Sequence, residues 1–96
     1  MLAAYNKLDN DHAVALDHKV TDAAALPKLS AVLYAVQAFQ EELENNVRWM
    51  AACGTPMPAD ETNALRSDVE LLIEDIMADR SRRASIIREN LHDAGL

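Results

Sequence analysis

The sequence predicts an all-α protein built on a long antiparallel helical hairpin, and three observations carry that prediction. Apolar residues recur at strict seven-residue spacing at Leu29, Val36, Leu43 and Met50. Such a stripe indicates the buried side of one long helix. The segment 54–58, which reads Gly-Thr-Pro-Met-Pro, then breaks the pattern, and a second helical pattern follows it. With only two Gly and three Pro among 96 residues, the composition also suits helices.

Residues 1–25 are expected to form an N-terminal segment, a loop or a short helix lying across a helical hairpin made of residues 26–96. Within this segment, the triplet 9–11 (Asp-Asn-Asp) indicates a turn or the end of a helix. After it, larger side chains at Val14, Leu16, His18 and Val20 alternate with Ala15, Asp17 and Lys19. This period of two leaves open an extended strand, which would have to pair with its copy in a dimer.

The first long helix should begin between Ala24 and Pro27, because proline is tolerated only in the first turn of a helix. It should end near Cys53, where Gly54 supplies a stop. From Leu29 to Phe39 it is apolar on every side. A helix of this kind is covered on more than one side. The second cover is either the N-terminal segment or a second copy of the chain, and we expect a second copy to complete a four-helix bundle.

The second helix should open at Asp60 and Glu61, which suit the positive end of a helix. Its apolar stripe comprises Leu65, Val69, Leu72, Ile73, Ile76 and Met77. The helical spacing continues to about His92, so we expect one unbroken helix. The alternative is a break at 79–81, with a short third helix after it. In either case Gly95 should end the chain's last helix.

Charge is distributed unevenly along the chain, whose net charge is −7. Residues 60–79 hold seven acidic residues and a single arginine. Five of these acids form an expected partner-facing surface, which would steer a basic target toward the protein: Asp68, Glu70, Glu74, Asp75 and Asp79. The alternative for this surface is an imitation of nucleic acid that blocks a basic partner.

Four arginines form a basic cluster near the C-terminus: Arg80, Arg82, Arg83 and Arg88. A second hypothesis makes the protein a nucleic-acid-associated regulator that uses this cluster. No aromatic residue is interleaved with the arginines, and the whole chain is acidic. We therefore expect them to pair with acids one helical turn away, and expect the replacement of Arg82 and Arg83 by alanine to leave the fold intact.

Catalytic, metal and cofactor chemistry find little support in the chain. It has no nucleophile elbow, phosphate loop or Cys-x-x-Cys pair, so we expect no enzyme and no cofactor. Asp9, Asp11, His12, Asp17 and His18 crowd one stretch, but their spacing matches no metal site and suggests a solvated polar turn. Cys53 is the only cysteine. With no signal peptide visible and no uncharged stretch long enough to cross a bilayer, the expected location is the cytoplasm.

The expected function is binding to another protein, as a regulator, adaptor or inhibitor. Its affinity would come from apolar residues outside the hairpin seam, both for a protein partner and for a second copy in a homodimer. These candidate interface residues are Leu33, Tyr34, Trp49, Ile86 and Ile87. For Trp49 an alternative is packing over the hairpin loop against Met57. We expect no membrane partner, and nucleic acid is the less favoured hypothesis.

Overall fold

Three helices make up the computed structural model, which describes residues 2–19 and 21–93. Helix α1 spans Leu2–Ala15, α2 spans Ala25–Ala52 and α3 spans Ala59–Asp93. No strand occurs among the described residues, so the prediction of an all-α protein is confirmed. The molecule is a rod with extents of 63 × 18 × 17 Å.

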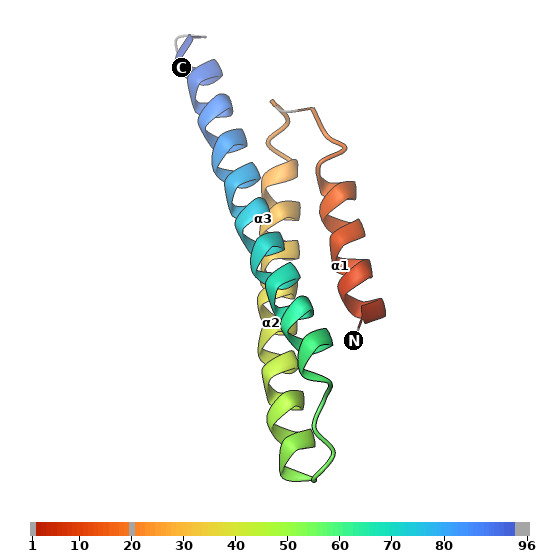
Figure 1. The fold of residues 1–96 in the computed structure, drawn as a ribbon. Coiled ribbons are helices and arrows are strands. Elements are labelled where there is room, and N and C mark those ends of the chain that lie inside the picture. The colour runs from red at the N-terminus through yellow and green to blue at the C-terminus, as the bar shows by residue number, and fades with distance from the viewer. Residues whose placement is uncertain (1, 20, 94–96) are drawn as a thin grey trace.

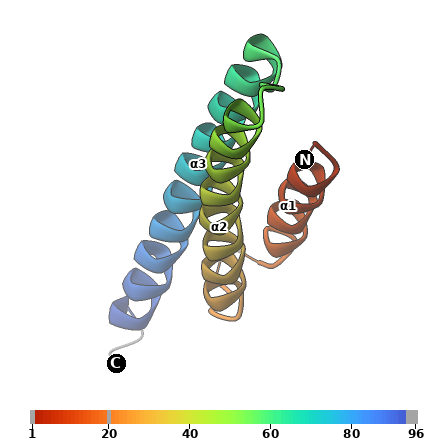
Figure 2. The ribbon, with the colours of Figure 1, turned by 90° about the horizontal axis from the view of Figure 1, so that it is seen from below.

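Helices α2 and α3 lie side by side and run in opposite directions, as Figures 1 and 2 show. Helix α1 packs against α2, antiparallel to it, and also contacts α3. Because α1 has 14 residues and α2 has 28, α1 covers only about half of the α2–α3 pair. The last turns of α3 continue beyond the start of α2 (Figure 1). The rod is therefore three helices thick over only part of its length.

The core lies along the predicted stripe of α2 and the matching stripe of α3. Leu29, Val36 and Leu43 are completely buried. From α3, the core takes Val69, Leu72 and Ile76. Met77 is a correction to the predicted stripe, since it is 52% exposed. It lies one residue past Ile76, which turns its side chain about 100° away from the seam.

The junction between α2 and α3 is a glycine-terminated helix end, as predicted. Gly54 has a φ of +80°, and the structure leaves open space around its α-carbon. The Gly54 N–H donates to the Ala51 carbonyl at 3.2 Å, and the Thr55 N–H donates to the Met50 carbonyl at 3.1 Å. This pair of bonds is a Schellman motif, which satisfies carbonyls that the helix end would otherwise leave unpaired.

The N-terminal segment departs from two expectations. The triplet 9–11 does not stop a helix, because α1 continues through it to Ala15. The reason is tertiary packing, since Tyr5, Leu8, His12 and Ala15 lie three or four residues apart and are all at least partly buried. The extended alternative for 14–20 is wrong over the described residues, as Val14 and Ala15 are helical and residues 16–19 form a turn without strand character. Val20 itself lies outside the described residues.

Helix α3 runs unbroken through 79–81, which confirms the prediction of a single helix. At its start, the Thr62 hydroxyl donates to the Pro58 carbonyl at 2.8 Å, and Asp60 and Glu61 occupy the first turn. The predicted stop at Gly95 lies outside the described residues. Within the described part of the chain, none of the helices has the length and apolar content that crossing a membrane requires.

Candidate functional site

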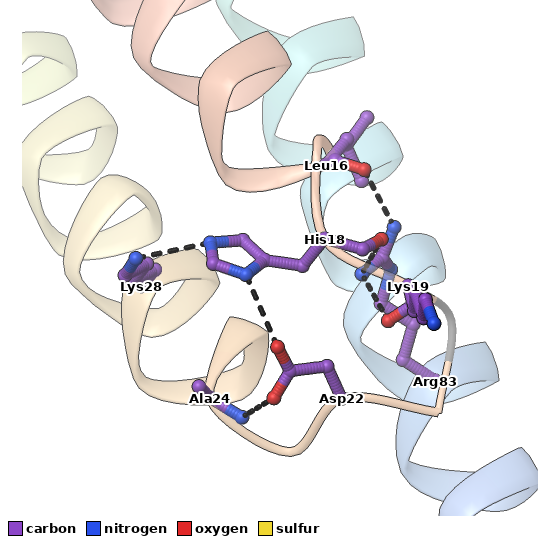
Figure 3. Close-up of polar contacts among 7 residues, drawn as sticks. All are labelled: Leu16, His18, Lys19, Asp22, Ala24, Lys28 and Arg83. Atoms are coloured by element: carbon purple, nitrogen blue, oxygen red, sulfur yellow. Dashed lines mark hydrogen bonds and ion pairs between the residues drawn. The ribbon is translucent and has the colours of Figure 1, made fainter.

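A polar cluster lies where the α1–α2 loop meets α3, and its centre is Arg83. This side chain is only 3% exposed. Its guanidinium donates to the carbonyls of Leu16 at 2.9 Å, His18 at 3.2 Å and Lys19 at 3.5 Å (Figure 3). The Arg83 Nε–H is buried and has no hydrogen-bond partner among the residues that the structure describes. One arginine of α3 thus holds the chain just after the end of α1, where carbonyls lack helical partners.

A second buried contact joins α1 to α3 one turn earlier. The His12 Nε2–H donates to Asp79 Oδ2 at 3.0 Å, and His12 is 8% exposed. The other carboxylate oxygen of Asp79 accepts from Arg82 at 3.2 Å. The Asp79 carboxylate is therefore engaged on both oxygens, by one residue of α1 and one of α3.

A chain of three polar side chains joins the α1–α2 loop, through His18 and Asp22, to Lys28 of α2. The Lys28 ammonium lies 3.0 Å from His18 Nε2, and His18 Nδ1 lies 3.3 Å from Asp22 Oδ2 (Figure 3). Because an ammonium can only donate, Nε2 accepts and the proton of the neutral ring is on Nδ1. Asp22 Oδ1 also accepts from the Ala24 N–H at 2.9 Å. The Ala24 N–H and His18 together hold the pKa of Asp22 below its usual range.

The contacts of this cluster hold the α1–α2 loop against α2 and α3. No serine, threonine or cysteine is bonded to this array in the described contacts. Among residues 2–19 and 21–93, no group of three or more histidine, cysteine, aspartate or glutamate side chains is placed to hold a metal ion.

The acidic set that the sequence singled out is divided between two sides of α3. Asp79 is half-buried against α1, whereas Asp68, Glu70, Glu74 and Asp75 are exposed. Asp68 and Asp75 act on Tyr5 of α1, whose pKa is raised first by burial and then by Asp9, Asp68 and Asp75. Glu70 and Glu74 lie on other sides of the helix, by the rotation of about 100° per residue.

The four arginines do not form one exposed surface, which corrects the basic cluster. The Arg83 side chain is buried where α3 packs against the α1–α2 loop, and it donates to the Leu16 carbonyl. Arg82 donates to Asp79, as the pairing with nearby acids predicted, and Arg80 Nε donates to the Ser30 hydroxyl at 2.8 Å. The expectation that both Arg82 and Arg83 can be replaced without effect on the fold is not compatible with the contacts of Arg83.

The five candidate interface residues fall into two groups. Tyr34 and Trp49 are 75% and 70% exposed, on sides of α2 that face away from α3. Leu33, Ile86 and Ile87 are half-buried, and Leu33 packs against the core. The alternative for Trp49, burial over the α2–α3 loop, is not supported by its exposure.

Sequence reasoning missed the structural role of Arg83 and His12, although a signal for Arg83 was present. Val69, Ile76 and Arg83 follow one another at seven-residue spacing. Arg83 therefore occupies the position that the buried stripe of α3 predicts for an apolar residue. For His12 the only signal is its distance of four residues from Leu8, which becomes informative once α1 is known to be a helix.

Comparison with protein-family models, with curated proteins and with solved structures gave no match for this chain.

Proposed function

We propose that this chain is a protein–protein interaction module of the cytoplasm, which acts as a regulator, adaptor or inhibitor of another protein. The observation that carries the proposal is the exposure of Tyr34 and Trp49 on α2. Large aromatic side chains at exposed positions are costly in water and are enriched among the residues that dominate binding energy. Cys53 is free and exposed, which suits a reducing compartment.

We further propose that α2 and α3 act as a helical hairpin that pairs with a second copy in a four-helix bundle. Three features support this pairing. The rod is only 18 × 17 Å across. Leu71 and Met77 of α3 are 56% and 52% exposed, in addition to the two aromatic residues of α2. A second copy that covered these side chains would remove their apolar surface from water, and this burial would stabilise a symmetric dimer.

The experiment compares the wild-type protein with two double variants in sedimentation equilibrium. The wild-type mass should approach twice 10.6 kDa at high micromolar concentration. The Tyr34→Ser, Trp49→Ser variant should remain monomeric and keep its helical circular dichroism. The matched control replaces two exposed uncharged residues of the same helix, Gln37→Ser and Asn45→Ser, and should dimerise like the wild type.

The partner is sought by affinity capture from the native host with the same three proteins. A specific partner should be retained by the wild type and the control and lost with the aromatic variant. The proposed function is contradicted if the wild type stays monomeric and its captured proteins do not change when Tyr34 and Trp49 are replaced.

A further inference from the structure

A groove of about 490 Å³ lies beyond the N-terminal end of α1, against the α2–α3 loop and the first turns of α3. Its volume is within the range of about 300–1,000 Å³ that proteins use for binding. Apolar atoms dominate its wall, which is formed by Leu2, Met57, Pro58, Ala64 and Leu65. Thr62 also lines it, with its hydroxyl already donating to the Pro58 carbonyl.

The groove begins where α1 begins, since Leu2 is part of its wall. Figure 1 shows that α2, α3 and their loop continue past this end of α1 without a third helix beside them. The difference in length between α1 and α2 leaves about 20 Å of the pair uncovered, which is room for a helix of about 14 residues. A helix placed there would extend the three-helix packing of the other half of the rod.

The charged side chains that line the groove are Glu61 and Asp68, and its wall contains no cationic side chain. Both carboxylates are exposed. Arg66, the single arginine between residues 60 and 79, does not line the groove. Its guanidinium is held by both oxygens of Glu44 on α2, at 2.6 and 2.9 Å, which lowers the pKa of Glu44. The groove is therefore apolar at its wall and negative at its rim.

From this arrangement we propose that the groove binds an amphipathic helix of a partner protein, with leucine-like side chains on one side and lysine or arginine beside them. The apolar side of the helix would pack on Leu2, Met57 and Leu65, while its cations would lie near Glu61 and Asp68. Recognition of a helix by an apolar groove with complementary charge at its edges is a common mode of peptide binding. The inference rests on the proposed function and names the class of partner.

Isothermal titration calorimetry with two synthetic 14-residue peptides tests the proposal on the full chain. One peptide carries leucine at helical spacing with lysine at the other positions, and its counterpart carries glutamate in place of lysine. The wild type should bind the lysine peptide, with an affinity that falls as salt is added. It should not bind the glutamate peptide.

Two charge-reversal variants separate the groove from the general acidity of the protein. Glu61→Lys with Asp68→Lys should weaken binding of the lysine peptide about tenfold or more, because both rim charges become repulsive. Glu70→Lys with Glu74→Lys makes the same change in net charge on residues outside the groove. This control should change the affinity by less than about threefold, since exposed charges at a distance are screened.

A third variant fills the groove. Ala64 is exposed and lines it, so Ala64→Trp should keep the helical circular dichroism and abolish binding of the lysine peptide. Three outcomes would overturn the inference. The two charge-reversal variants could bind the lysine peptide with equal affinity, Ala64→Trp could bind it as the wild type does, or the wild type could fail to bind it. A second copy of the chain would be the occupant if Ala64→Trp lost the dimer mass and the wild type did not bind the peptide. That result would also overturn the inference. The proposed function fails separately, in the assays on Tyr34 and Trp49.

Discussion

Arg83 shows how one side chain can replace both an apolar core residue and a helix cap. It occupies the seven-residue register of Val69 and Ile76, yet it ends at three carbonyls of the α1–α2 loop. The planar guanidinium suits this role because its donors are fixed in a fork. An apolar residue at this position would remove these hydrogen bonds from α3. The Lys19 carbonyl would still accept from the Asp22 N–H at 2.9 Å. The part-buried Leu16 and His18 carbonyls, in contrast, would lose the donor that Arg83 supplies, which is costly.

Replacing Arg83 should therefore destabilise the protein far more than replacing its neighbour. We expect Arg83→Ala to lower the free energy of unfolding by roughly 2–3 kcal/mol, because the loop carbonyls lose a buried charged donor. Arg83→Lys should recover only part of the loss, since an ammonium lacks the fork. Urea unfolding measures both changes.

Arg82→Ala is the control, because Arg82 has a side chain that is 61% exposed and makes one surface ion pair. It should cost less than about 1 kcal/mol. Similar losses for the two alanine variants would contradict the assignment of Arg83 as the side chain that holds the loop.

Asp22 should give the α1–α2 loop a pH-dependent contribution to stability. Its pKa is lowered in the folded protein by the Ala24 N–H and by His18. A lowered folded-state pKa stabilises the fold above the unfolded-state value of 3.8. That contribution is lost as the pH falls through the lower folded-state value.

The difference in melting temperature between the wild type and Asp22→Ala should therefore be largest at neutral pH and narrow below about pH 4. Asp17→Ala changes an exposed carboxylate of the same loop and serves as the control. If the difference in melting temperature between the wild type and Asp22→Ala stays constant from neutral to acid pH, the result would contradict the proposed loop contacts.

At the scale of the element, burial separates residues of the same type on the two long helices. Leu43 of α2 is completely buried, whereas Leu71 of α3 is 56% exposed. Both lie in helix interiors, so they share the same helix propensity and differ in their packing. The free energy of unfolding should therefore depend on the side chains packed between α2 and α3, and not on the total apolar content of the helices.

Leu43→Ala should lower the free energy of unfolding by about 2–5 kcal/mol, the usual cost of a cavity at a buried leucine. Leu71→Ala should change it by less than about 0.5 kcal/mol, as exposed substitutions do. Chemical denaturation at a concentration where the protein is monomeric measures both. Equal costs would show that the seam between α2 and α3 is not placed as described.

For the whole molecule, α1 is the helix with the weakest apolar attachment. Its buried apolar side chain among the described residues is the small Ala15, and Tyr5 and Leu8, which pack against the core, are only partly buried. Two polar contacts also hold α1: His12 donates to Asp79, and Arg83 donates to the carbonyls of the loop that follows α1. Regions with few buried apolar contacts open at a lower free energy than the core does.

Native-state hydrogen exchange should accordingly find the amides of α1 opening in a partial unfolding step, before the amides around Val36 and Leu72. Arg83→Ala should lower the opening free energy of α1 and leave the core amides closer to their wild-type values. Protection of α1 equal to that of the core would indicate a single cooperative unit and would contradict this expectation.

The sequence by itself determined the two long helices and the seam between them. Leu29, Val36 and Leu43 were predictable because a seven-residue apolar period has one helical interpretation, and Gly54 was predictable because a left-handed helix end favours glycine. The exposed positions of Tyr34 and Trp49 follow from the same periodicity, since both lie off the stripe.

Only the tertiary structure decided the form of residues 2–19 and the role of Arg83. The local signals around 9–11 favour a turn, and contacts of Tyr5, Leu8 and His12 with the rest of the chain override them. From the sequence alone, Arg83 is expected to be an exposed charge. Its buried role depends on carbonyls of the α1–α2 loop, and a sequence does not show which distant backbone groups need a donor. The groove beyond Leu2 likewise arises from the different lengths of three packed helices, which no local pattern encodes.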